Sequence, residues 1–201
     1  LIEGIHGQYA AAGSRIVNAN TFGASAHKLA GSTYTLEQVI TAGIENCKRA
    51  CAPYGALTAL DVGPLGELLE PSGTLAFEDA VAEYARIVKA GEAAGADLIF
   101  FETYTDLYEL KAALLAAKEN THLPILASMS FEAGGRTFTG CTVESFAATA
   151  RGLGADAVGI NCSLGPKEIF PMAKRLAEAV PGNFPVFVKP NAGLPRADRR
   201  W

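Results

Sequence analysis

The sequence has few cysteines and no long hydrophobic run, and each shortage excludes a class of protein. Four cysteines in 201 residues have neither the density nor the spacing of a disulfide framework. We therefore expect reduced thiols and a cytoplasmic location. No apolar run approaches the ~20 residues of a membrane-spanning helix, so we expect no membrane partner.

Clustered basic residues and an identifiable catalytic histidine are also missing. The formal net charge is -4, and no Lys/Arg cluster stands out. This disfavours binding to nucleic acid or to an anionic membrane surface. His6, His27 and His122 lie in helical or loop contexts, and no Ser-His-Asp or Cys-His set can be assembled by spacing. A hydrolase is therefore disfavoured.

What the sequence does contain is a regular alternation of short apolar runs and Ala-rich stretches with helical periodicity. The apolar runs, predicted to be strands, cover residues 15–21, 57–63, 97–103, 124–131, 157–163 and 185–191. The predicted helices cover residues 1–12, 35–52, 75–94, 106–120, 142–153 and 166–180. Strands that are apolar throughout are typical of a parallel sheet buried on both faces.

The predicted helices carry recognisable end signals. Asp106 is expected to begin the helix over 106–120, Thr142 to cap the helix that follows it, and Ser72 or Thr74 to cap the helix over 75–94. Pro166 stands at a first helical position.

Polar residues at the carboxyl ends of nearly all strands decide between two α/β architectures. No Gly-x-Gly-x-x-Gly follows a strand, which disfavours a dinucleotide-binding doubly wound sheet. In a (β/α)8 TIM barrel these strand ends converge on one mouth, where active sites lie. We therefore predict one barrel domain over residues 1–201. It is expected to be incomplete, with about six of the eight strands and with the first and last strands missing.

Glu102 is the strongest candidate for a residue of a binding site. It directly follows the apolar residues 98–101, and a carboxylate in such surroundings needs a positive partner. A substrate ammonium group or a neighbouring Lys or Arg would serve. Asp61, before a Gly-Pro turn, is expected to cap that turn rather than to act in catalysis.

The cysteines and a strand-end turn leave alternatives open. Asn20, Thr21 and the backbone around Gly23 can bind a carboxylate or an amino group, or merely satisfy their own turn. Cys47 and Cys51, four apart in a helix, are expected to pack rather than to bind zinc. Cys162, in GINCSLGP, has no evident base to activate it, so residue spacing alone favours a packed thiol over a nucleophile or a zinc ligand.

Six motifs in order change the interpretation of Cys162. They are NANTFGA (18–24), DVGPLGELLEPSG (61–73), DLIFFET (97–103), GRTFTG (135–140), GINCSLGP (159–166) and KPNAGLP (189–195). Together they resemble the homocysteine S-methyltransferase family, and most of all the homocysteine-binding barrel of its cobalamin-dependent methionine synthases. The resemblance covers essentially the whole chain and implies a (β/α)8 barrel.

The resemblance also implies a zinc-dependent reaction. Family members bind zinc through three cysteines, one of which matches Cys162; the other two lie in a Gly-Gly-Cys-Cys-Gly motif that this sequence lacks. Zinc would deprotonate the homocysteine thiol, and the thiolate would take a methyl group, from methylcobalamin on a separate module, to give methionine. We expect these 201 residues to bind zinc weakly or not at all.

The remaining site residues and partners follow from the same resemblance. Glu102 would hold the amino group of homocysteine, and Asn191 with Thr21, Phe22 and Gly23 would fix its amino-acid end. Asn161 would support the strand that carries the metal ligand. Homocysteine and cobalamin- and folate-binding modules or proteins are the implied partners. A betaine- or S-methylmethionine-dependent enzyme, and an inactive barrel fragment acting only in binding or assembly, are the alternatives.

Overall fold

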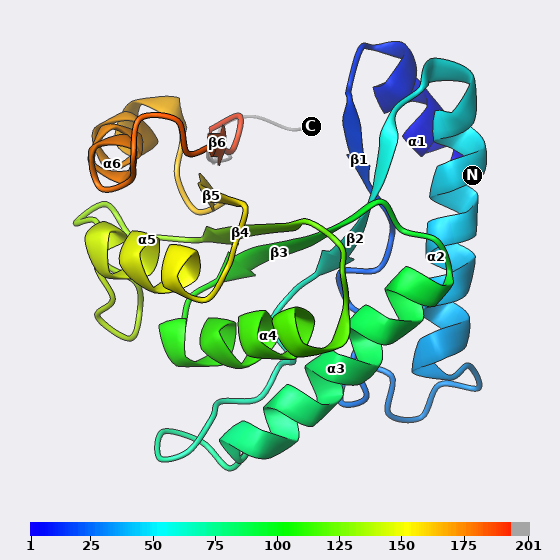
Figure 1. The fold of residues 1–201 in the computed structure, drawn as a ribbon, viewed down its shortest axis with the longest axis horizontal. Coiled ribbons are helices and arrows are strands. Elements are labelled where there is room, and N and C mark those ends of the chain that lie inside the picture. Colours follow the sequence, from blue (N-terminus) through cyan, green and yellow to red (C-terminus); the bar gives the residue numbers. More distant parts are fainter. Residues whose placement is uncertain (194–201) are drawn as a thin grey trace, which may run out of the picture.

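A computed structural model describes residues 1–193, which form a curled parallel sheet with helices on its outer face (Figure 1). The strands are β1 (Ile16–Asn18), β2 (Leu57–Val62), β3 (Leu98–Tyr104), β4 (Ile125–Met129), β5 (Ala157–Asn161) and β6 (Val186–Lys189). The helices are α1 (Ile2–Ala11), α2 (Leu36–Cys51), α3 (Phe77–Ala93), α4 (Leu107–Asn120), α5 (Val143–Gly152) and α6 (Pro166–Glu178), with a short 3-10 turn, η1 (Ala52–Tyr54).

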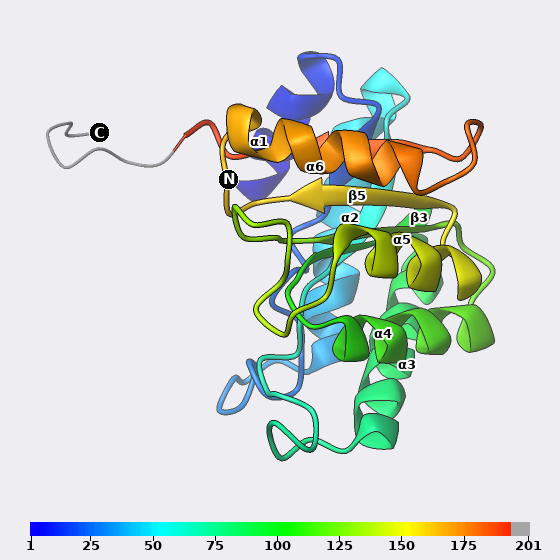
Figure 2. The same ribbon diagram turned by 90° about the vertical axis from the view of Figure 1, so that its left-hand side faces the viewer.

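The strands pair in the order in which they occur in the sequence, from β1 to β6, and every pairing is parallel. Figure 1 shows the sheet bending around a concave interior, with α2 to α6 arrayed along its convex side. Figure 2, turned by 90°, shows α5 and α6 on that outer side next to β5. The prediction of an α/β fold built as six strands of an incomplete TIM barrel is confirmed for the described residues.

The side-chain period of two in the strands creates the two layers. One set of strand residues packs beneath the helices, among them Leu60, Ile99 and Phe101. The alternate set forms a second, smaller apolar cluster on the inner face, made by Ala59, Leu98, Phe100, Leu126 and Phe187. Helix α4 fits tightly because four alanines on its buried side, at positions 112, 113, 116 and 117, are fully buried.

The expected cap at Thr142 and the helix start at Asp106 are confirmed, with Asp106 as the N-cap residue of α4, and the expected cap of α3 is wrong. Asp106 Oδ1 accepts a hydrogen bond from the Tyr108 amide at 3.0 Å, and Thr142 Oγ1 accepts one from the Ser145 amide at 3.2 Å. Neither Ser72 nor Thr74 caps α3, whose N-cap is Ala76, without a side-chain bond. The preceding segment is closed by its own backbone bonds between Leu68, Glu70 and Leu75, so the helix starts later than expected.

The cysteine pair in α2 packs as expected. Cys47 and Cys51 are buried with their sulfur atoms 3.8 Å apart, and Cys47 donates to the Val17 carbonyl. Burial raises the pKa of the Cys47 thiol to about 12. All four cysteines are free thiols. Among the helices of residues 1–193, none has the length and apolar character needed to cross a membrane.

Candidate functional site

The inner face of the sheet turns from apolar to polar at the carboxyl ends of the strands. Four residues of the inner apolar cluster are each followed two positions later by a polar residue: Asp61 follows Ala59, Glu102 follows Phe100, Ser128 follows Leu126, and Lys189 follows Phe187. On β5, Asn161 follows Gly159 in the same way. Because the strands are parallel, these side chains belong to the same end of the sheet. The period of two therefore places a polar rim on an apolar floor.

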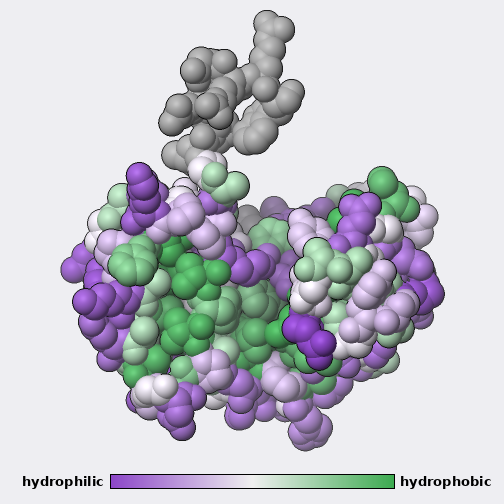
Figure 3. All heavy atoms as spheres, turned by 90° about the horizontal axis from the view of Figure 1, so that it is seen from above, coloured by the Kyte–Doolittle hydropathy of each residue, from purple (hydrophilic) through white to green (hydrophobic). Residues whose placement is uncertain are grey.

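A groove of about 810 Å³ runs along this concave face. Ile16 of β1 and Phe187 of β6 line it from opposite edges, and Asp61 and Lys189 lie at its polar end. Figure 3 shows the hollow, with hydrophobic residues between two more hydrophilic flanks. The groove can take an apolar group below and a charged group at the rim.

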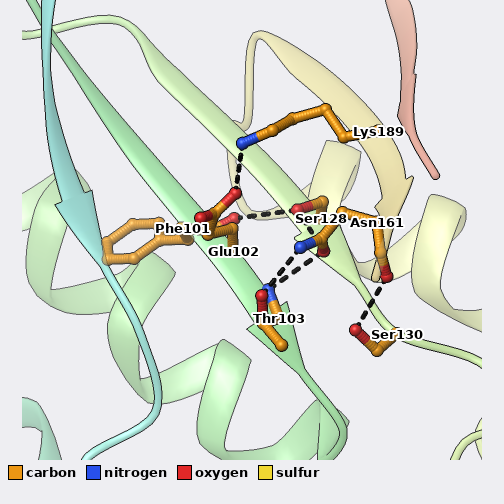
Figure 4. A network of polar contacts seen from close by, with 7 residues as sticks. All are labelled: Phe101, Glu102, Thr103, Ser128, Ser130, Asn161 and Lys189. Carbon is orange, nitrogen blue, oxygen red and sulfur yellow. Dashed lines mark hydrogen bonds and ion pairs between the residues drawn. The ribbon is translucent and has the colours of Figure 1, made fainter. Parts of the chain in front are cut away.

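Glu102 has a lysine partner at the rim. The Lys189 ammonium donates to Glu102 Oε2 at 2.5 Å (Figure 4). It also lies 4.6 Å from the centroid of the Phe100 ring. The Glu102 side chain is 14% exposed and that of Lys189 is 48% exposed. Of the two partners expected for this carboxylate, the chain itself therefore supplies the basic side chain.

Asp61 is buried beside this pair and lacks the role expected for it. Its side chain does not cap the following turn, because Gly63 N donates to the Phe22 carbonyl and Leu65 N donates to Glu109. Its Oδ1 is buried and has no hydrogen-bond partner among the described residues. Burial, and then the Glu102 carboxylate, raise the pKa of Asp61 well above its usual range, while the Lys189 ammonium opposes the rise.

The turn after β1 is locked onto β2. Thr21 Oγ1 donates to the Asp61 carbonyl at 2.8 Å and accepts from the Asp61 amide at 3.0 Å. The buried Thr21 hydroxyl is therefore engaged as both donor and acceptor within the protein. The Phe22 ring lies against Gly63, where an added Cβ would stand 2.5 Å from Cε2. Gly23 has open space on its Cβ side. Thr21 therefore fixes the turn that presents Phe22 and Gly23.

Asn161 joins three strands through its side chain (Figure 4). Its Oδ1 accepts from the Thr103 amide at 3.0 Å and from Ser128 Oγ at 2.9 Å, and its Nδ2 donates to Thr103 Oγ1 at 2.7 Å. Ser130 Oγ donates to its carbonyl. Thr103 has φ 67° at an irregularity in the β3–β4 pairing, so the Asn161 amide stabilises a strained strand end.

Cys162 follows at the point where β5 ends. It has φ 62°, and Ser163 has φ 60°, so two consecutive non-glycine residues are left-handed. The Cys162 amide donates to the Lys189 carbonyl at 3.1 Å, and the Asn191 amide donates to the Leu164 carbonyl at 3.0 Å. These bonds place half-buried Cys162 and Asn191 in one joint between β5 and β6.

Glu109 is a residue that the sequence analysis missed. It lies on the buried face of α4, 5% exposed, and accepts from the Leu65 amide at 2.7 Å and from Tyr84 Oη at 2.9 Å. Burial raises its pKa. It thereby anchors the loop after β2. A carboxylate next to Leu110, at helical spacing from buried alanines, was the available signal.

Comparison with known proteins identifies the family. A family model described as homocysteine S-methyltransferase matches residues 1–201. The chain belongs to the homocysteine S-methyltransferase family. Methionine synthases of Mycobacterium tuberculosis (strain ATCC 25618 / H37Rv) and Mycobacterium leprae (strain TN) are 29% and 30% identical to it. The alignments cover 97% of this chain but 17% of each relative, so the chain spans about a sixth of their length.

Solved structures related to this homocysteine S-methyltransferase family member share its fold. The metallated form of the homocysteine methyltransferase MmuM from Escherichia coli superposes with a TM-score of 0.84 at 21% identity. The superposition covers 95% of this chain and 72% of that one. The oxidised form of MmuM gives a TM-score of 0.82 at 22% identity.

The zinc site implied by the family resemblance is not assembled by the described residues. Within residues 1–193 there is no group of three or more His, Cys, Asp or Glu side chains that could hold a metal ion. Cys162 directly follows β5, whereas Cys47 and Cys51 lie on the buried face of α2. One thiolate does not hold a zinc ion in a site that ordinarily has three protein ligands.

Proposed function

We propose that residues 1–201 form one homocysteine-binding barrel domain of a cytoplasmic homocysteine S-methyltransferase of the methionine synthase type. The observation that carries the proposal is the Glu102 carboxylate, which already holds the ammonium group of Lys189, a residue that lines the apolar groove. The family match and the two methionine synthase relatives support the choice of substrate and reaction.

The residues at the rim would bind the amino-acid end of homocysteine. Glu102 accepts hydrogen bonds from the α-ammonium group, and this pairing is strengthened because the carboxylate is largely buried. The backbone of Thr21, Phe22 and Gly23, together with Asn191, fixes the remaining polar atoms. Asn161 would support the site without contacting the substrate, since its side-chain amide is already hydrogen-bonded to the strand end at Thr103.

Activation of the homocysteine thiol requires more metal ligands than the described residues supply. Cys162 would contribute one thiolate ligand to a zinc ion, and zinc, when bound, would lower the pKa of the substrate thiol. Because the described residues do not complete such a site, substrate binding and orientation are the steps that they can carry. The methyl donor is proposed to be methylcobalamin, presented with folate by other modules or proteins.

The binding step is tested by titrating L-homocysteine into the protein and measuring heat. Glu102→Gln keeps the size of the side chain and removes its charge, so affinity is expected to fall about tenfold or more. Glu178→Gln, in the exposed Lys174–Glu178 pair, is the matched control and should leave affinity unchanged. Equal affinity of Glu102→Gln and the unsubstituted protein would exclude this role for Glu102.

The donor is tested separately. Methylcobalamin, betaine and S-methylmethionine are offered in turn with homocysteine and zinc, and methionine is measured. Turnover with methylcobalamin alone supports the methionine synthase type. Turnover with either of the other donors points to the alternative enzymes. Homocysteine binding without turnover by the intact protein, with every donor, favours a binding or assembly role.

A further inference from the structure

Lys189 occupies the carboxylate to which the substrate ammonium group is assigned. Its ammonium donates to Glu102 Oε2 and lies over the Phe100 ring. A substrate ammonium group at Glu102 would compete with the Lys189 ammonium for the carboxylate and would be repelled by it. Displacement of Lys189 from Glu102 relieves this repulsion, and its charge then needs a new partner.

The geometry allows Lys189 to move at little cost. The residue is the last of β6, and its side chain is about half exposed. A half-exposed ion pair contributes little to stability, and a lysine stem is flexible. The pair can open without disturbing the sheet, whose β5–β6 bonds are made by the backbone.

Asp61 offers a second carboxyl group at the same point. It lines the groove, is 7% exposed, and has an Oδ1 without a partner among residues 1–193. An unpaired polar atom buried in this way is costly unless a ligand or a proton satisfies it. Asp61 and Lys189, the partner of Glu102, line the same groove. The raised pKa of Asp61, caused by burial and then by the Glu102 carboxylate, agrees with this placement.

We propose that Lys189, Glu102 and Asp61 together bind the zwitterionic head of an α-amino acid. Glu102 and Asp61 accept hydrogen bonds from the α-ammonium group, while Lys189 turns from Glu102 to the α-carboxylate. Each charge of the ligand then faces an opposite charge of the protein. This inference rests on the proposed function and adds Lys189 and Asp61 as determinants of specificity for amino acids.

Three thiols that differ in one charged group separate the roles. Homocysteine has both charges, homocysteamine lacks the carboxylate, and mercaptobutyrate lacks the ammonium group. Their affinities are measured by calorimetry on the unsubstituted protein and on Lys189→Met, Lys189→Arg and Asp61→Asn. Lys174→Met, which opens the exposed pair with Glu178, is the control. Circular dichroism checks that each variant folds.

Lys189→Met is expected to lower the affinity for homocysteine about tenfold. The affinity for homocysteamine should stay unchanged or rise, because Glu102 is freed. Lys189→Arg should keep most of the homocysteine affinity. Asp61→Asn should lower the affinity for homocysteine and for homocysteamine, the two thiols that carry an ammonium group. The affinity for mercaptobutyrate should stay unchanged. Lys174→Met should change none of the three.

Two results would overturn the inference while leaving the proposed function intact. One is homocysteine binding that Lys189→Met does not alter; the other is an equal loss of homocysteine and homocysteamine. Unchanged amine affinities in Asp61→Asn would remove Asp61 from the site. An unsubstituted protein that binds no homocysteine would overturn the proposed function and this inference together.

Discussion

The Lys189 ammonium lies 2.5 Å from Oε2 of Glu102, and 87 positions of sequence separate the two residues. Their strands, β6 and β3, are not neighbours, since β4 and β5 stand between them. In a flat sheet three strand spacings would separate the two backbones by about 14 Å. The contact is made across the concave interior, so the curvature of the sheet creates the charged rim of the groove.

Replacing Asn161 should destabilise the strand ends. Asn161→Ala leaves the Thr103 amide and hydroxyl without the partners they have now, in a largely buried place. We expect the free energy of unfolding to fall by about 3 kcal/mol, measured by urea denaturation. Exposed Asn183→Ala is the control and should cost almost nothing. A loss as small as the control's would contradict the joining role of Asn161.

Gly63→Ala should displace Phe22. The added methyl group would stand 2.5 Å from Cε2 and 2.6 Å from Cζ of the ring, so the ring must move. Because Phe22 is 39% exposed, we expect a loss of about 1 kcal/mol in stability and a weaker affinity for homocysteine. In a Phe22→Ala background the same change should cost little stability. Gly182→Ala, with open space around it, is the control. A stability loss that persists without the Phe22 ring would disprove the clash.

The raised pKa of Asp61 predicts a pH dependence of stability. Between the unfolded-state pKa near 4 and the higher pKa in the folded chain, the folded state holds more protons. The free energy of unfolding therefore falls as the pH rises through this interval, with a slope of about 1.4 kcal/mol per pH unit. Asp61→Asn removes this contribution.

Urea denaturation of both proteins between about pH 4 and about pH 8 measures the effect. The stability of Asp61→Asn relative to the unsubstituted protein should increase with pH. Buried Glu109 contributes a slope of the same sign in both proteins, so it cancels in the difference. A difference that stays constant with pH would show that Asp61 titrates normally.

The four thiols should react with iodoacetamide at different rates. Burial raises the pKa of Cys47 to about 12 and that of Cys141 to about 11, which leaves little thiolate on either. Cys51 is almost fully buried, whereas Cys162 is half-buried at a strand end. Peptide mass mapping should therefore find Cys162 labelled first, and Cys162→Ser should lose the fast phase. Early labelling of Cys47 would be inconsistent with its packing.

Much of the fold followed from local sequence pattern. The six strands and six helices lie where apolar runs and helical periodicity predicted them, and Asp106 and Thr142 cap their helices. Such features depend on residues within a few positions of one another. The misplaced start of α3 depends on how residues 68–75 close on themselves, which no helix signal records.

The residue types at the site also followed from sequence, but their partners did not. That Glu102 needed a positive partner could be stated from the apolar residues before it. The tertiary structure decided three things: the partner is Lys189, Glu109 holds the loop at Leu65, and Asp61 Oδ1 is left unpaired among the described residues. The alternation of residues along each strand determined which side chains face inward. Which of them meet depends on the register and curvature of the whole sheet, because these bring strands far apart in sequence to one rim.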